Sequence, residues 1–73
     1  MMSVISITDV EAALNKCTKS QPPEGNRLSK EGSMLSEIYG LMIYYHLAEA
    51  EPEVLLEKRV VSKDHLDILE KWL

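Results

Sequence analysis

The sequence predicts an all-α fold, a small bundle of three to four helices around a central apolar helix. Apolar residues recur at helical spacing in three separate segments, and a serine or threonine suited to a helix cap precedes each of them. The middle segment, over 33–48, holds one acidic residue and no lysine or arginine. The chain has 73 residues, which is room for a single helical domain over 1–73.

The first helix is expected over 9–19. Thr8 and Glu11 fit a capping box, in which the threonine hydroxyl accepts a backbone N–H three residues on and the glutamate reaches back. Apolar residues then follow on one stripe of this helix: Val10, Ala13, Leu14 and Cys17. A buried cysteine behaves as a small hydrophobe, so we expect Cys17 to lie in the core.

A loop is expected over 20–29. Pro22 and Pro23 cannot continue a helix, because proline lacks the backbone N–H and restricts the residue before it. Gly25 and Asn26 then suit a turn. We interpret the segment as a plain connector without a binding role.

The central helix is expected over 30–48, with Ser29 as its cap and Glu31 favourably placed in its first turn. It has two apolar faces. One face carries Met34, Leu35, Ile38, Leu41, Met42 and Tyr45. The other carries Ser36, Gly40, Ile43, Tyr44 and Leu47. A helix that is apolar nearly all round is usually buried, so we expect it at the centre of the domain or in an oligomer interface.

The remaining chain predicts a short turn or helix over 52–57 and a last helix over 63–72. Pro52 suits the first turn of the short element, and Ser62 suits the cap of the last helix. The conformation of 54–61 stays open, since its paired valines favour extended structure. One apolar stripe marks the last helix: Leu66, Leu69 and Leu73. The first and last helices together could therefore cover both faces of the central one.

The charge balance is acidic, with twelve acids, eight bases and a net charge of −4. Phosphate contacts require a basic surface, so we do not expect nucleic acid as a partner.

The longest mostly apolar run, over 38–48, is too short to cross a bilayer, and residues 1–8 lack the pattern of a secretory signal. A single cysteine excludes a disulfide framework within the chain. We therefore expect a cytoplasmic protein with no membrane contact.

Candidate catalytic and metal-binding residues are few. His46 and Glu49 could share a metal ion, and His65 and Asp64 could complete the set if the last helix folds back, but no strong metal-binding motif is present. The serines show no nucleophile motif, and the dispersed glycines form no phosphate-binding loop. We expect no metal, no cofactor and no enzymatic activity.

Three segments of the chain resemble a family of small bacterial proteins of unknown function. They are Ile-Thr-Asp-Val-Glu-Ala-Ala-Leu-Asn over 7–15, Ile-Tyr-Gly-Leu-Met-Ile-Tyr over 38–44, and the terminal Trp72 and Leu73. The resemblance implies a bacterial cytoplasmic protein that folds as one unit. It implies no activity, ligand or catalytic residue.

These observations favour a small non-catalytic module for protein interaction or regulation. The second face of the central helix would bind a protein partner or a second copy, through Ser36, Gly40, Ile43, Tyr44 and Leu47. Small residues four apart, such as Ser36 and Gly40, let another helix approach closely, and tyrosine is enriched at interfaces. A helix of the same chain filling this space is the alternative. Other functions left open are a helix-turn-helix-like nucleic-acid binder and an acidic mimic acting on a nucleic-acid-binding protein.

Overall fold

The computed structural model describes residues 4–22, 24–25 and 27–73. In this part of the chain the fold is helical, as predicted, with one small sheet of two short strands. The elements in chain order are β1 (Ile5–Ser6), α1 (Ile7–Ser20), α2 (Lys30–Tyr44), β2 (Glu49–Ala50), α3 (Pro52–Glu57) and α4 (Lys63–Trp72). None of the helices in these ranges is long and apolar enough to cross a bilayer.

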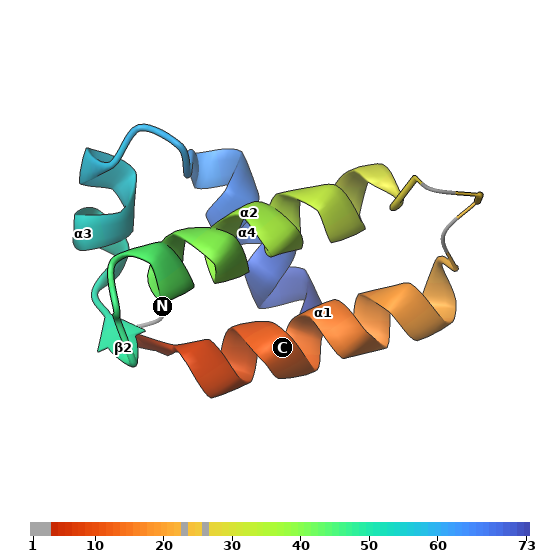
Figure 1. Ribbon diagram of the computed structural model, residues 1–73, viewed down its shortest axis with the longest axis horizontal. Coiled ribbons are helices and arrows are strands. Elements are labelled where there is room, and N and C mark those ends of the chain that lie inside the picture. Colours follow the sequence, from red (N-terminus) through yellow and green to blue (C-terminus); the bar gives the residue numbers. More distant parts are fainter. Residues whose placement is uncertain (1–3, 23, 26) are drawn as a thin grey trace.

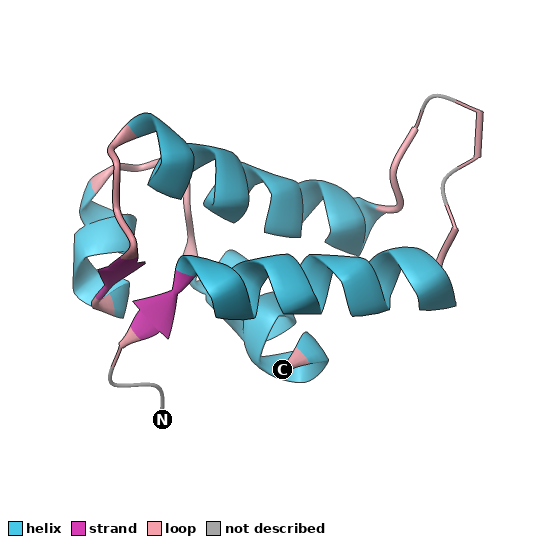
Figure 2. Ribbon diagram, turned by 60° about the horizontal axis from the view of Figure 1, so that its bottom comes forward, coloured by secondary structure: helices cyan, strands magenta, loops and turns pink. Residues whose placement is uncertain are grey.

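Helix α2 contacts both α1 and α4 (Figure 1). Helices α1 and α2 run side by side in opposite directions, and α4 crosses behind them (Figure 1). The small sheet and α3 lie at one end of this pair, and the loop between α1 and α2 lies at the other end (Figure 2). The last turn of α2 therefore lies at the same end as the sheet and α3.

The core lies between one face of α2 and the helices around it. Leu35, Ile38 and Met42 of α2 are fully buried there. The other fully buried side chains of the core come from β1, α1, α3 and α4: Ile5, Val10, Ala13, Cys17, Leu55 and Leu69. Cys17 thus lies where its place on the apolar stripe of α1 predicts. In α1, α2 and α4 the fully buried apolar side chains all belong to the predicted stripes, but Leu73, at the end of the stripe of the last helix, is 47% exposed.

The start of α1 differs from the sequence prediction. Its cap is Ser6, whose Oγ accepts the backbone N–H of Asp9 at 3.0 Å, so the capping box expected at Thr8 is wrong. Strand β1 pairs antiparallel with β2, and the Ile7 N–H donates to the Ala48 carbonyl at 2.8 Å. This pairing holds the chain extended up to Ser6, so the helix begins at the next residue. Neither short strand was expected from the sequence.

The first turn of α2 contains Gly32, and the packing around this residue leaves little room for a side chain. Ser29 is the cap, and its Oγ accepts the Gly32 N–H at 3.0 Å. Gly32 is buried, and a Cβ at this position would lie 3.1 Å from Ser29 Oγ and 3.8 Å from Cys17 Sγ. Glycine at this position lets α2 lie close to α1 while Ser29 keeps its capping geometry.

The end of α2 also differs from the prediction, since the helix ends at Tyr44 and not at 48. His46 has a φ of 56°, and the Leu47 N–H donates to the Met42 carbonyl at 2.8 Å. The His46 N–H donates to the Ile43 carbonyl at 3.1 Å, which completes a Schellman motif. This left-handed residue turns the chain back so that β2 can pair with β1.

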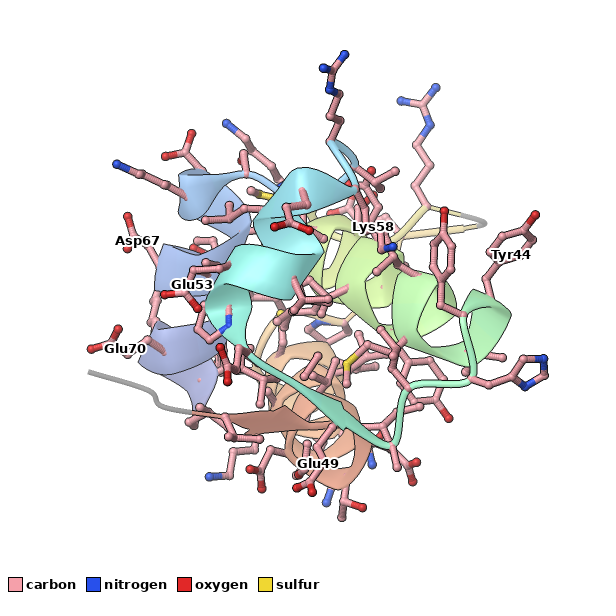
Figure 3. All side chains as sticks on the ribbon, turned by 90° about the vertical axis from the view of Figure 1, so that its left-hand side faces the viewer. Tyr44, Glu49, Glu53, Lys58, Asp67 and Glu70 are labelled. Atoms are coloured by element: carbon pink, nitrogen blue, oxygen red, sulfur yellow. The ribbon has the colours of Figure 1, made fainter. Side chains whose placement is uncertain are left out.

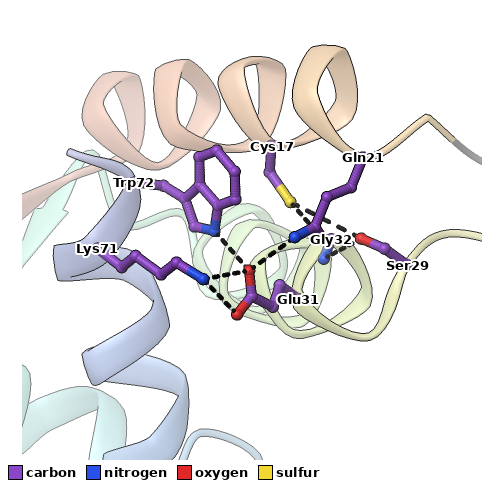
Figure 4. A network of polar contacts seen from close by, with 7 residues as sticks. All are labelled: Cys17, Gln21, Ser29, Glu31, Gly32, Lys71 and Trp72. Carbon is purple, nitrogen blue, oxygen red and sulfur yellow. Dashed lines mark hydrogen bonds and ion pairs between the residues drawn. The ribbon is translucent and has the colours of Figure 1, made fainter.

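A carboxylate in the first turn of α2 connects three helix ends (Figure 4). Lys71 Nζ lies 2.9 and 3.1 Å from the two oxygens of Glu31. Trp72 donates its indole N–H to Glu31 at 3.0 Å, and Gln21 donates its amide at 3.3 Å. The hydrogen bond from Lys71 is the main reason that the pKa of the Glu31 carboxyl is lowered below its ordinary value.

The Glu31 contacts predict a pH-dependent contribution to stability. A carboxyl whose pKa is lowered in the folded state stabilises the fold above its unfolded pKa of about 4.3, and this gain disappears as the pH falls through the folded value. We expect Glu31→Gln to lower the free energy of unfolding at pH 7 and to have a much smaller effect at pH 3. Urea unfolding at both pH values measures this difference. Glu24→Gln, at an exposed loop carboxylate, is the control; an equal loss at pH 3 and pH 7 for Glu31→Gln would contradict the assignment.

Candidate interaction surface

Apolar side chains are exposed together where α2 ends. We call this surface the tyrosine patch and define it as Gly40, Ile43, Tyr44, Tyr45 and Val60. The exposed fraction is 77% for Tyr44, 50% for Ile43, 50% for Val60 and 45% for Tyr45. Single exposed apolar residues are normal on a protein surface, whereas contiguous apolar patches often mark binding sites. The patch is therefore the candidate site.

The patch contains a shallow hollow of about 290 Å³. Its lining residues are Glu37, Gly40, Leu41, Tyr44, Tyr45 and Val60. The two tyrosine rings meet edge to face, with centroids 5.0 Å apart and an interplanar angle of 82°. Lys58 Nζ lies 4.3 Å from the centroid of the Tyr45 ring, within the range of a cation–π contact. Figure 3 shows Tyr44 projecting from the end of α2, with Lys58 between it and α3.

Gly40 lies on the exposed side of α2, and a Cβ at this position would meet nothing within 4 Å. The alternative that a helix of the same chain approaches closely at Gly40 is therefore wrong. A glycine in a helix interior costs about 1 kcal/mol relative to alanine. Packing within the described chain does not account for this cost.

The five residues predicted for the interface do not all lie together. Gly40, Ile43 and Tyr44 are exposed and belong to the patch. Ser36 is half-buried, and Leu47 is half-buried and packed against the core. Leu47 leaves the predicted face because α2 ends at Tyr44 and the chain turns at His46.

Sequence reasoning missed two residues of the patch, Tyr45 and Val60. Helical spacing placed Tyr45 on the first apolar face, with the residues that form the core, but it is the C-terminal cap of α2 and is nearly half exposed. Val60 lies between α3 and α4, where its neighbour Val61 is buried instead. The sequence carries no signal for either placement, because both depend on where the preceding helix stops. Tyr39, by contrast, packs against the core, and its hydroxyl donates to Glu11 at 3.3 Å.

Two residues next to the patch in the sequence, one after Tyr45 and one before Val60, adopt left-handed backbone conformations without being glycine. His46 has a φ of 56° and Arg59 a φ of 64°, and each ends a helix at the position that glycine usually takes. The Arg59 N–H donates to the Leu56 carbonyl at 3.2 Å. A non-glycine residue in this region costs about 1 kcal/mol or more. Strain of this kind is concentrated at functional sites.

His65 is held by contacts on both ring nitrogens. Its Nδ1 accepts the backbone N–H of Ser62 at 3.1 Å and lies 2.9 Å from the Ser62 hydroxyl. Because Nδ1 accepts a backbone N–H, the ring proton lies on Nε2, which donates to Glu37 at 3.1 Å. This is a capping box at the start of α4, with histidine in the place of the usual glutamate. The serine, histidine and glutamate thus close a helix terminus and hold α4 against α2.

The residues considered for metal binding do not form a cluster. His65 uses both ring nitrogens as above, and His46 and Glu49 are both exposed. Within the ranges that the structure describes, no three or more histidine, cysteine, aspartate or glutamate side chains are grouped for a metal ion.

The open space above Gly40 predicts that alanine is accepted there. Gly40→Ala is expected to raise the free energy of unfolding by about 0.5–1 kcal/mol, because it removes the entropic cost of glycine in a helix. Gly32→Ala is the matched control in the same helix, where the new Cβ must displace Ser29 Oγ and the gain is lost. Urea unfolding compares the two variants. Destabilisation by Gly40→Ala would show that this side of α2 is covered.

Comparison with known proteins identifies a family for most of the chain but names no residue of the patch. Residues 3–65 match the model of a family described as a protein of unknown function, DUF3717. No curated protein and no solved structure gives a significant match. The patch therefore has to be interpreted from its own geometry.

Proposed function

The chain belongs to the DUF3717 family, whose function is unknown, and we propose that it is a non-catalytic module that binds a protein partner through the tyrosine patch. The main observation in support of this proposal is the exposed position of Gly40 on α2. A solvent-facing glycine in a helix interior lowers stability, and open space at its Cβ position suits the close approach of a partner backbone.

The side chains around Gly40 support the same proposal. Tyr44 and Tyr45 present large rings with polar tips, which is the composition found at the centre of interfaces. The rings form the walls of an apolar hollow into which a partner side chain can insert. Interfaces of this kind concentrate their binding energy in a few aromatic residues. We expect Tyr44 to be such a residue because it is the most exposed side chain of the patch.

The nucleic-acid-binding alternative has less support. The outer surface of α4, the helix that would read a base sequence, exposes Asp64, Asp67 and Glu70, which phosphate groups repel.

The proposal also includes a bacterial cytoplasmic location. The single thiol, Cys17, is buried and free, as is usual for proteins of a reducing compartment.

Affinity capture from a lysate of the source organism tests the proposed function. The wild-type chain is expected to retain a protein that both Tyr44→Ala and Gly40→Leu lose by at least about tenfold, because each change alters the centre of the patch. Leu28→Ala is the control, since Leu28 is an exposed apolar residue outside the patch. Thermal unfolding of each variant shows that the fold is kept.

Two results would contradict this function. One is capture that is the same for the wild-type chain, Tyr44→Ala and Gly40→Leu. The other is a captured protein that Leu28→Ala loses to the same extent, because binding would then not depend on the patch.

A further inference from the structure

We propose that the hollow of the tyrosine patch receives an arginine side chain of the protein partner. The aliphatic part of this arginine lies over Gly40, and its guanidinium group contacts the Tyr44 ring and the Glu37 carboxylate. This inference rests on the proposed function, since it names the chemical group that the same surface recognises.

The lining of the hollow contains one charged residue, Glu37, and otherwise consists of glycine, leucine, valine and two tyrosines. An apolar side chain that covered Glu37 would remove water from the carboxylate without replacing the lost hydrogen bonds, which is unfavourable. An acidic side chain would be repelled by the same carboxylate. A cationic side chain with an apolar stem is complementary both to the carboxylate and to the apolar walls.

The Glu37 carboxylate is held in place by His65 and remains accessible. It accepts the Nε2–H of His65 at 3.1 Å, and the Glu37 side chain is 48% exposed. Because Nδ1 of His65 accepts the backbone N–H of Ser62, the ring carries one proton and no charge. The histidine therefore orients the carboxylate without neutralising it. Within the described part of the chain, the second oxygen of Glu37 has no hydrogen bond and can accept one from a partner.

The space over Gly40 has the right neighbours for an arginine. Glu37 and Tyr44 lie about one turn before and one turn after Gly40 on the same face of α2, about 10 Å apart along the helix axis. The gap between them is open, since a Cβ at Gly40 would meet nothing within 4 Å. A guanidinium group in this gap can stack its plane on the ring and direct its N–H groups at the carboxylate. Lysine, with a compact ammonium group, cannot form both contacts in this way.

The tyrosine rings already bind a cation of the chain itself. Lys58 Nζ lies 4.3 Å from the centroid of the Tyr45 ring. Tyr44 meets Tyr45 edge to face and is 77% exposed, so much of its ring is free for a second cation. The hollow has room for one large side chain, with a volume of about 290 Å³.

The charge of this end of the molecule also favours a basic partner. Segment 49–59, which contains β2 and α3, has two bases, Lys58 and Arg59, and four exposed acids: Glu49, Glu51, Glu53 and Glu57. Figure 3 shows Glu49 and Glu53 at the same end of the molecule as Tyr44. An excess of negative charge over a surface of this size steers a basic segment towards it.

Selection from a random 12-residue peptide display library on the immobilised chain tests the inference. We expect the peptides whose binding requires Tyr44 to share an arginine. Replacing this arginine by citrulline, which keeps the shape and removes the charge, should weaken binding about tenfold. In Glu37→Gln the same replacement should cost about twofold or less, because the carboxylate is absent.

Glu49→Gln is the matched control, since it removes one charge from the same end of the molecule but not from the hollow. This variant should show the full effect of citrulline. Glutamine at position 37 keeps an oxygen that can accept the Nε2–H of His65, so thermal unfolding of Glu37→Gln should show an intact fold.

The outcomes separate the inference from the proposed function. Tyr44-dependent peptides that share no arginine, or an equal effect of citrulline in Glu37→Gln and wild type, overturn the arginine and leave the interaction function standing. Failure to select any peptide that Tyr44→Ala weakens overturns both. Tyr44-dependent binding of a 15-nucleotide oligothymidylate, or Tyr44-dependent dimerisation in sedimentation, would assign the hollow to nucleic acid or to a second copy and overturn the inference.

Discussion

Leu35, Ile38 and Met42 lie fully buried along one face of α2, where α1 and α4 pack, and the positions of the other elements depend on this contact. With 3.6 residues in each helical turn, the backbone that buries these side chains directs Gly40 and Tyr44 to the opposite side. The described chain leaves that side uncovered at the last turn of α2. The tyrosine patch is therefore a geometric consequence of the way the core is built.

The pairing of β1 with β2 determines how much of α2 remains helical. It requires the chain to turn at His46, which ends the helix at Tyr44 and carries Leu47 onto the core. The same end of the molecule holds α3, and Lys58, the C-terminal cap of α3, lies over the Tyr45 ring. Two helix ends, each closed by a left-handed residue, thus surround one apolar hollow. The patch combines exposed rings, an exposed glycine and the Lys58 ammonium because these two ends meet.

The sequence predicts the helices well and their connections poorly. Apolar spacing and the serines at 29 and 62 indicate where α2 and α4 begin, because these signals act within one helical turn. The sheet has no such signal, since two-residue strands show no alternation and their pairing joins distant segments. Ser6 and Thr8 are both good caps, and only the sheet selects Ser6. For the same reason Gly40 and Tyr44 could be assigned to the candidate surface from helical spacing, whereas Tyr45 and Val60 could not.

The central claim is that the tyrosine patch is open in the isolated chain. Hydroxyl-radical footprinting read out by mass spectrometry measures the solvent exposure of each tyrosine directly, and the three tyrosines are internal references for one another. Our account predicts the fastest oxidation at Tyr44, slower oxidation at Tyr45 and the slowest at Tyr39, with the same order at low and high protein concentration. Protection of Tyr44 to the level of Tyr39 at every concentration would contradict the account, because this side of α2 would then be covered by the chain itself.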